Sequence, residues 1–473
     1  MKTPTWTEEN DTMIYSMFQD FYKNYISKDL FNRGLELYVT STCNLNCEYC
    51  YLAKYEDDLY PKEFRDPKLI LKNMKIFLNY LVENHMVFGF VDLFAGEIWH
   101  TDFGEAVLHV LLTEYIAKID KKPDRVMIPT NGTFLKYPER VAKIEKYIKD
   151  FSFYNTNLTF SFSNDGLILD EINRPLKEDQ EKYAEKEKYY DDLAVFCKKH
   201  GFGFHPMVNA AAIEKWPDNY KWWIDLLKKY NFSLLDNIMF LEVRNDEWTT
   251  EKILGYLKFL NTAFFYNAQV FDDGDLTKGI DDILMVSKRT LQQTNGNYYN
   301  LVIGRSNKKL SCTLPRTIIV RMGDLAWVPC HRTSYEKFVF GRFNVDENGK
   351  ITGMTANNIP LLMSIHSLTY YMMPKCDICT FHDYCMRGCL GAQFEANKEL
   401  LYPCETVCEL YMAKNIYLFE LAEYQMKKLG HNNRRLLNEL EHERKFMYNQ
   451  IPTEVREKWH KIIRDNNLLD SMI

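Results

Sequence analysis

Three cysteines stand close together near the start of the chain, in the stretch Cys43-Asn-Leu-Asn-Cys47-Glu-Tyr-Cys50. Thiolates at this spacing are ligands for a soft metal ion or for an iron-sulfur cluster. A four-iron cluster held by only three thiolates keeps one iron open, as is required of a metal that binds a small molecule directly. A zinc knuckle is the alternative use of the same three residues.

A second group of cysteines lies in the C-terminal third of the chain. Its spacing is tight, and its members are Cys312, Cys330, Cys376, Cys379, Cys385, Cys389, Cys404 and Cys408. Paired cysteines two residues apart suit zinc as well as iron-sulfur clusters, so a pair of zinc sites is the alternative here. The two groups hold eleven of the twelve cysteines. The twelfth, Cys197, lies beside Leu193 and Phe196 in a helical stretch and is predicted to be an inert core residue.

Six short β-rich runs, each followed by a longer helical run, must position the first group. They cover residues 35–40, 87–94, 125–130, 158–163, 202–208 and 238–243. The first helix is the clearest, with Asp66 as N-cap, Pro67 at the first position and one apolar face at Ile70, Met74, Phe77, Leu78 and Leu81. This alternation predicts an α/β fold, an open, partial (β/α)6 TIM-like barrel with helices outside. Ligands then bind at the carboxyl ends of the strands.

The rest of the chain divides by composition. We expect an N-terminal extension at 1–34, the barrel at 35–265, a polar bridge at 266–310, a cysteine-rich domain at 311–408 and a helical tail at 409–473. The cysteine-rich domain contains a predicted hairpin that turns at Asn348-Gly349. The tail carries a predicted packing stripe at Leu410, Met412, Ile416, Leu418, Leu421 and Met426.

Polar segments follow the strands at the end where ligands are expected. They are Ala95-Gly96-Glu97 after the second, Thr130-Asn131-Gly132-Thr133 after the third and Ser161-Phe-Ser163-Asn164-Asp165-Gly166 after the fourth. Each is an ordinary turn-forming sequence by itself, but their repetition at successive strand ends indicates a ligand site. Glu242 and Arg244 end the sixth strand, either as contacts to cofactor or substrate or as a solvated pair.

The cysteine triplet, with Tyr49 before its last member, resembles the signature of the radical S-adenosylmethionine (SAM) superfamily, and the three polar segments resemble segments of the same enzymes. The resemblance implies a four-iron cluster on Cys43, Cys47 and Cys50 whose open iron is chelated by SAM. It also implies reductive cleavage of SAM to a 5′-deoxyadenosyl radical. The implied SAM contacts are Tyr49, Ala95, Gly96, Glu97, Thr130, Asn131, Ser161, Ser163 and Asp165, with Glu242 and Arg244 as further candidates.

The C-terminal cysteines resemble the SPASM domain, which follows the barrel in many peptide-modifying radical SAM enzymes and carries two auxiliary four-iron clusters. The resemblance implies one cluster on Cys376, Cys379, Cys385 and a later cysteine, and another on Cys312, Cys330, Cys389 and a fourth ligand. Which of Cys404 and Cys408 serves which cluster stays open. The chain departs from the family at Gly323, which precedes Cys330 by seven positions rather than five.

His331 is a second departure, because sulfatase-maturating relatives carry an aspartate used in deprotonation directly after this cysteine. We expect His331 to be a catalytic base, a neighbour of a cluster or a structural residue. This departure disfavours a mechanism of the sulfatase-maturating type.

Composition narrows the partners and the compartment. The net charge of −6, with both signs interspersed, shows no basic face for nucleic acid. The sequence has neither a secretory signal nor an apolar run of membrane-spanning length, so we expect no membrane partner and a cytoplasmic location. Reduced thiols also fit the cytoplasm.

The domain pairing predicts modification of a ribosomally synthesised peptide by crosslinking, thioether formation, epimerisation or excision. The alternatives are formylglycine-forming oxidation, radical chemistry on a small metabolite, and a scaffold without catalysis. The expected partners are a peptide or protein substrate and an external electron donor of the flavodoxin or ferredoxin type. About 34 residues precede the first strand, too few for a fused leader-binding domain, so a separate leader-binding protein is a further expected partner.

Overall fold

The structure is a computed structural model, and it describes residues 33–94, 96–177, 185–232, 237–271, 286–287, 289–291, 293–294, 317–366, 373–385, 388–428 and 434–470. Ala95 and Cys312 lie outside the described residues, as do most of the predicted bridge and all but two residues of the predicted N-terminal extension.

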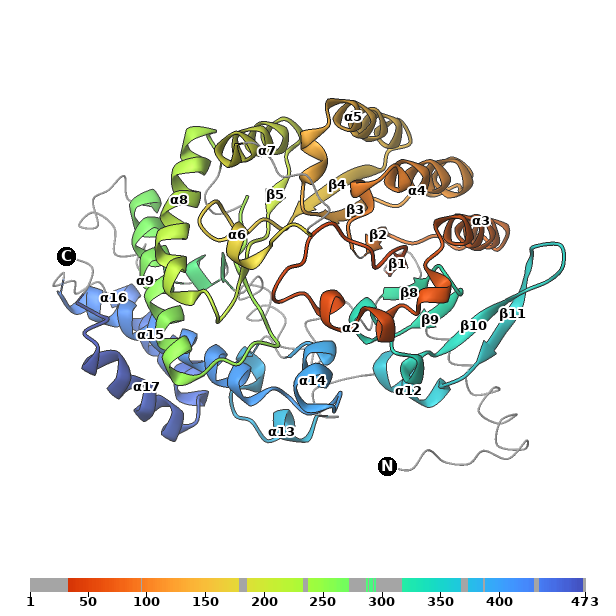
Figure 1. The fold of residues 1–473 in the computed structure, drawn as a ribbon. Helices are drawn as coiled ribbons and strands as arrows, with labels where there is room; N and C mark the ends of the chain where they lie inside the picture. Colours follow the sequence, from red (N-terminus) through yellow and green to blue (C-terminus); the bar gives the residue numbers. More distant parts are fainter. Residues whose placement is uncertain are drawn as a thin grey trace.

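A parallel sheet forms the centre of the molecule (Figure 1). Its neighbouring strands are β1 (Gly34–Tyr38), β2 (Phe90–Phe94), β3 (Arg125–Thr130), β4 (Asn157–Phe162) and β5 (Gly203–Phe204). The next unit is the parallel pair of β6 (Met207–Val208) and β7 (Leu241–Glu242), and a single bridge from Phe204 to Ile238 continues the sheet. All six predicted runs are therefore strands or bridges, and the last two are broken into short pieces.

Helices cover the outer side of this sheet, as Figure 1 shows. They are α3 (Pro67–Glu83), α4 (Phe103–Leu111), α5 (Pro138–Phe153), α7 (Lys186–His200), α8 (Trp216–Lys229) and α9 (Thr250–Phe271). In α3 the side chain of Asp66 accepts a hydrogen bond from the Lys68 amide at 3.1 Å, and the predicted apolar face is the buried one. The partial barrel with external helices is confirmed.

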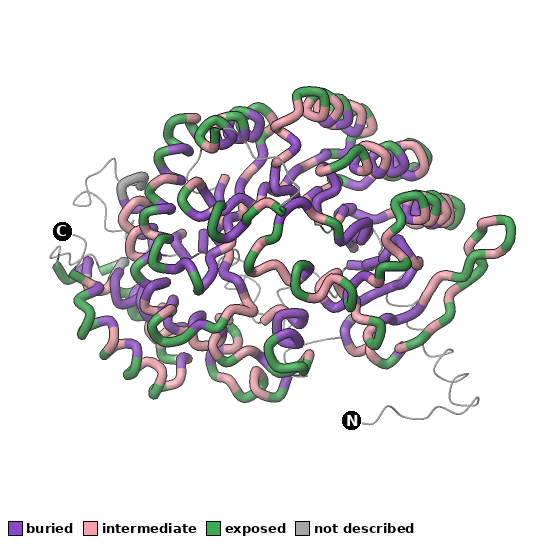
Figure 2. The backbone as a smooth tube through the Cα atoms, in the orientation of Figure 1, coloured by how far each residue is buried: buried purple, intermediate pink, exposed green. Residues whose placement is uncertain are grey.

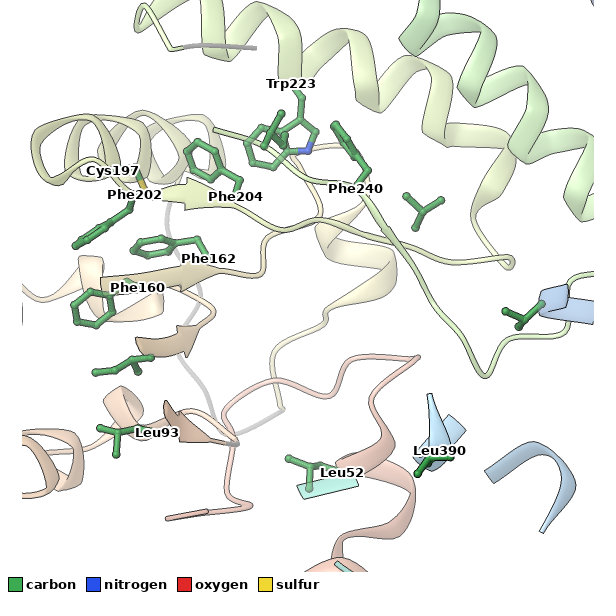
Figure 3. Packing of buried hydrophobic residues seen from close by; sticks show 14 of the residues in the cluster. Leu52, Leu93, Phe160, Phe162, Cys197, Phe202, Phe204, Trp223, Phe240 and Leu390 are labelled. Carbon is green, nitrogen blue, oxygen red and sulfur yellow. The ribbon is translucent and has the colours of Figure 1, made fainter. Parts of the chain in front are cut away.

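Alternate residues of each strand face this helical layer and form the core. Leu35, Leu37, Val91 and Leu93 are buried in one continuous apolar cluster, and the strands stand out as buried in Figure 2. Figure 3 shows the aromatic part of the cluster, where Cys197 lies among the phenylalanines of β4 and β5. Cys197 is fully buried, and burial raises the pKa of its thiol well above the ordinary value, so the prediction of an inert core residue is confirmed.

The cysteine-rich region adds strands to the same sheet, which the sequence analysis did not predict. β8 (Thr317–Arg321) pairs in parallel with β1 along all five residues. β9 (Ala326–Val328), β10 (Gly341–Val345) and β11 (Ile351–Ala356) follow in antiparallel order. Among the described residues the order is therefore β11-β10-β9-β8-β1-β2-β3-β4-β5. The predicted hairpin is confirmed as β10 and β11, with Gly349 at a φ of +76° in the turn.

The C-terminal part ends in helices. Short helices α12 (Ile359–His366), α13 (Pro374–Asp377) and α14 (Leu390–Asn397) precede α15 (Glu405–Lys428), α16 (Arg434–Phe446) and α17 (Thr453–Asp465). The predicted stripe of α15 is buried, with Met412 half-buried, because α15 packs between α9 and α17. No helix in the described part of the chain is long and apolar enough to cross a membrane.

Candidate active site at the carboxyl ends of the strands

The cysteine loop lies between β1 and α2 (Tyr51–Leu59), at the carboxyl end of the sheet. The segment after the short helix α6 (Asp170–Asn173) pairs with it through backbone hydrogen bonds. The Asn46 amide donates to the Pro175 carbonyl at 2.8 Å and the Glu48 amide to the Asn173 carbonyl at 2.9 Å. These bonds hold the loop over the strand ends.

The thiols of this loop lie in a buried environment. Burial, together with the neighbouring Cys47, raises the pKa of Cys43 to about 12. Burial also raises the pKa of Cys47 to about 12, against the lowering effect of Arg174. A buried thiolate needs a compensating positive charge, which iron supplies, so this set of three soft donors fits an iron-sulfur cluster. Within the described residues no three His, Cys, Asp or Glu side chains converge on the position of a single metal ion.

Gly96 and Glu97 join the end of β2 to the cysteine loop. Gly96 has a φ of +65°, and a Cβ atom there would lie 2.4 Å from the carbonyl oxygen of Thr42. The Glu97 amide donates to that same oxygen at 2.9 Å. Only glycine satisfies both the left-handed backbone and the close approach.

The carboxylate of Glu97 ties the end of β2 to the end of β3. It accepts hydrogen bonds from the Asn131 amide at 2.7 Å, the Thr130 hydroxyl at 2.9 Å and the Trp99 amide at 3.1 Å. Burial raises its pKa, against the lowering effect of these donors. Glu97 is therefore a fixed part of the site.

The turn after β3 packs directly on the cysteine loop. The side-chain amide of Asn131 donates to Asn44 Oδ1 at 2.8 Å, and the side-chain amide of Asn44 donates to the Thr133 hydroxyl at 2.9 Å. The structure thus brings the polar segments after the second and third predicted strands together with the cysteines.

The segment after β4 contributes a charged group that the sequence analysis missed, Arg174. Its guanidinium is buried and donates to the hydroxyls of Tyr49 and Ser163, each at 3.1 Å. The Tyr49 hydroxyl in turn donates to Asp165 Oδ2 at 2.8 Å. Burial raises the pKa of Asp165, and the charge of Arg174 opposes that rise. The signal in the sequence is weak: Arg174 follows the Asp165-Gly166 turn by eight residues and directly precedes Pro175.

Arg174 and Asn131 also line a cavity of about 860 Å³ beside the cysteine loop. Its walls include Leu45 from the loop and Tyr189 and Tyr190 from α7. The buried guanidinium is therefore reachable from this cavity.

Ser161 lies on the inner face of β4, away from the helices. Its hydroxyl oxygen is 2.8 Å from Nδ1 of His205, and burial lowers the pKa of His205. Ser161 thus stands one inward-facing position below the Ser163 and Arg174 contact.

Glu242 and Arg244 stand apart from these contacts, at the junction of β7 and the tail. The Glu242 carboxylate is buried, accepts from the Tyr411 hydroxyl at 2.7 Å and lies 3.2 Å from Lys414 Nζ. Arg244 Nε is 3.5 Å from Glu242 Oε1. A solvated pair is therefore wrong for Glu242, whose charge is compensated inside the protein.

His331 lies against the inner face of β1 and β2, next to the predicted ligand Cys330. Its Nδ1 is 2.7 Å from Glu36 Oε1, and its ring stacks on Phe94 with centroids 3.9 Å apart. Because a carboxylate only accepts, this contact places a proton on Nδ1.

The auxiliary cysteines fall into two neighbourhoods. Burial raises the pKa of the Cys408 thiol well above its ordinary value, and the neighbouring thiols of Cys385, Cys376 and Cys379 raise it further. Cys330 and Cys389 instead border Arg332, whose guanidinium forms a bidentate pair with Glu395 at 2.5 and 2.6 Å.

Solved structures with a similar fold exist. The structure of anSMEcpe with bound AdoMet is 17% identical in sequence, covers 86% of this chain and 99% of its own, and superposes with a TM-score of 0.51. The same protein with AdoMet and the Cp18Cys peptide gives the same values. The chain therefore shares the fold of anSMEcpe.

One curated protein sequence is also similar to this chain. The tungsten-containing aldehyde ferredoxin oxidoreductase cofactor-modifying protein of Pyrococcus furiosus is 20% identical over 365 residues, which are 74% of this chain and 88% of that protein. No protein-family model matches the chain. The predicted fold is confirmed: the chain is α/β, with a parallel sheet at its centre, helices around it and a cysteine-rich C-terminal part.

Proposed function

We propose that this chain is a radical SAM enzyme that cleaves SAM reductively and modifies a ribosomally synthesised peptide. The observation that carries the proposal is the direct bonding of the cysteine loop to the turns after β2, β3 and β4 on a fold shared with an AdoMet-bound protein. The peptide part is supported by the Cp18Cys peptide bound to anSMEcpe.

The residues divide into ligands and positioning groups. Cys43, Cys47 and Cys50 would hold a four-iron cluster, which together with SAM supplies the electron and the 5′-deoxyadenosyl radical for hydrogen abstraction. Arg174 offers a buried cation and Ser163 a hydroxyl, a combination that suits the carboxylate of SAM. Glu97 keeps Gly96 and the neighbouring backbone in place for the amino group.

The remaining predicted SAM contacts keep the roles of binding or orientation. Asn131 and Thr130 are fixed by hydrogen bonds to Glu97 and Asn44, so the turn after β3 is held in one geometry. Tyr49 and Asp165 form a bonded pair at the end of β4. Ser161 lies deeper, and Ala95 keeps its predicted role.

The auxiliary cysteines would hold two further four-iron clusters. We assign Cys408 to the cluster of Cys376, Cys379 and Cys385, and the proximity of these thiols, whose charges raise the pKa of Cys408, supports the assignment. Cys404 is then left for the set of Cys312, Cys330 and Cys389. Such clusters would accept an electron from a substrate radical and release it to an external acceptor, whereas an external donor of the flavodoxin or ferredoxin type would supply the electron that cleaves SAM.

His331 keeps its predicted catalytic role as a base on the inner face, oriented by Glu36. A separate leader-binding protein is the further partner that we propose. The proposed location is the cytoplasm, because its reducing environment preserves thiols.

Iron content and SAM cleavage test the proposal. Anaerobically purified protein should contain about 12 irons per chain, and reductant plus SAM should release 5′-deoxyadenosine. Cys43→Ala should abolish that release, whereas Cys197→Ala, which changes a core thiol far from the loop, should retain it. Release that survives in Cys43→Ala, or stoichiometric zinc with little iron, would refute the proposal.

A second candidate is modification of a small cofactor rather than a peptide. The name of the Pyrococcus furiosus relative favours it. Mass spectrometry of peptides and of small molecules after co-expression with the flanking genes separates the two, because only one fraction should lose hydrogen or gain a new bond.

A further inference from the structure

Two carboxylates stand side by side on the inner face of the sheet. Glu36 of β1 and Asp92 of β2 are register partners in the parallel ladder, so their side chains project from the same face. That face is opposite to Leu35, Leu37 and Leu93, which pack in the apolar core. It is the face on which Glu36 meets His331.

Both carboxylates are buried, and one is incompletely partnered. Glu36 is 6% exposed and Asp92 is 9% exposed. Asp92 Oδ1 has no hydrogen-bond partner in the part of the chain that the structure describes. Burial and the neighbouring Glu36 both disfavour a charge on Asp92 and raise its pKa to about 7. A buried acceptor without a donor is costly, so a donor that arrives with a ligand would be bound strongly here.

No cation among the described residues donates to the open oxygen of Asp92. Arg125, whose charge lowers the pKa of Asp92, lies at the start of β3, where its guanidinium covers the ring of Phe90 at 5.1 Å. His331 uses its Nδ1 on Glu36. Neither group donates to Asp92 Oδ1.

The inner face is partly exposed beside the pair. Met127 of β3 is the register partner of Asp92, Thr159 of β4 is the partner of Met127, and both are half-buried. Asp92 lies two residues before the end of β2, which is about 7 Å below the strand ends where SAM is proposed to bind. The stem of a lysine or arginine side chain is long enough to cover that depth.

We propose that Glu36 and Asp92 bind the cationic head group of a basic substrate side chain, an ammonium or guanidinium, at the floor of the barrel. This inference rests on the proposed function, because it names the class of residue that the enzyme holds below the SAM site. A cation between two carboxylates relieves their mutual repulsion and satisfies the open oxygen of Asp92. Substrates with an apolar side chain at that position would leave the open oxygen of Asp92 without a donor.

Binding of small probes tests the inference without knowledge of the substrate. Nα-acetyl-lysine methylamide and its arginine counterpart are compared with Nα-acetyl-norleucine methylamide, which has a similar stem and no charge, by NMR titration of the iron-loaded, SAM-bound protein. At least one basic probe should bind about tenfold more tightly than the norleucine probe, and the better of the two identifies the head group. Equal binding of all three probes would overturn the inference, and this comparison needs no variant.

Two variants locate the binding. Asp92→Asn should reduce the advantage of the basic probe to about twofold or less, whereas Asp124→Asn, which removes an exposed carboxylate directly before β3, should leave it unchanged. Unaltered basic-probe binding in Asp92→Asn would also overturn the inference. SAM binding by the unaltered protein is measured in the same samples, so its absence would count against the proposed function and would be distinguished from a failure of the acidic pair.

Discussion

At the scale of single residues, buried charge governs the site. Arg174 lies beside the buried Asp165 and the half-buried Asp170, and it also fixes Tyr49 and Ser163. Its position after the Asp-Gly turn makes it both a structural counter-ion and the strongest candidate for holding an anionic group of SAM. These two roles can be separated, because they respond differently to a change that keeps the charge.

Arg174→Met should destabilise the protein by about 3–5 kcal/mol, because it leaves buried carboxylates without a counter-ion. Arg174→Lys should recover most of that stability but still weaken SAM binding about tenfold, since a lysine cannot donate to two hydroxyls in a fixed fork. Denaturant midpoints and equilibrium dialysis with SAM measure the two effects. Full SAM affinity in Arg174→Lys would contradict the binding role.

Substitutions of Cys385, Cys404 and Cys408 should show which of these cysteines share an auxiliary cluster. If Cys408 shares a cluster with Cys385, the double variant Cys385→Ser/Cys408→Ser should lose no more iron than either single variant, about four per chain. Cys385→Ser/Cys404→Ser should lose more than either single variant, because two clusters are affected. Iron analysis and electron paramagnetic resonance of the reduced proteins check this, and additive loss in the first pair would reverse our assignment.

At the scale of elements, close contacts between turns hold the cysteine loop. The turn after β2 approaches the backbone of Thr42 so closely that no side chain fits at Gly96. The turn after β3 and the strand-like segment after α6 hold the same loop from other sides. Protein contacts therefore hold the loop in shape, which lowers the ordering cost of cluster binding.

Gly96→Ala should lower iron incorporation at the first cluster and reduce SAM cleavage at least tenfold, because the new methyl group must displace the loop backbone. Gly201→Ala is the matched control, since Gly201 also has a positive φ, +71°, but has no atom within 4 Å of the added Cβ. That control should cost about 1 kcal/mol of stability and leave iron content intact. Equal effects of the two variants would show that backbone strain alone matters.

At the scale of the whole molecule, a buried ion pair joins the barrel to the tail. Glu242 of β7 and Lys414 of α15 are both almost fully buried, and Lys414 also donates to the Thr294 carbonyl at 3.0 Å. Burial lowers the pKa of Lys414 and the charge of Glu242 opposes that change. The pair fixes how α15, which carries Cys408 at its start, lies against the barrel.

Lys414→Met should destabilise the protein by at most about 3–5 kcal/mol, because the buried Glu242 carboxylate loses its closest cation and keeps only Arg244, at 3.5 Å. The double variant Glu242→Gln/Lys414→Met should regain most of that loss, since both charges are gone and the packing volume is similar. Denaturant unfolding of all three variants checks this. A double variant as unstable as Lys414→Met would mean that the pair contributes through packing and not through charge.

The sequence by itself determined the barrel strands, the first helix and the hairpin, because each depends on local periodicity, capping and turn chemistry. It also placed Glu97, Asn131 and Ser163 near the cysteines, since carboxyl ends of parallel strands meet at one edge. Only the tertiary structure decided that β8 extends the sheet beside β1, that Arg174 enters the site and that Glu242 is buried against Lys414. These features join segments far apart in the chain, and no local pattern encodes which distant charge or strand edge becomes the partner.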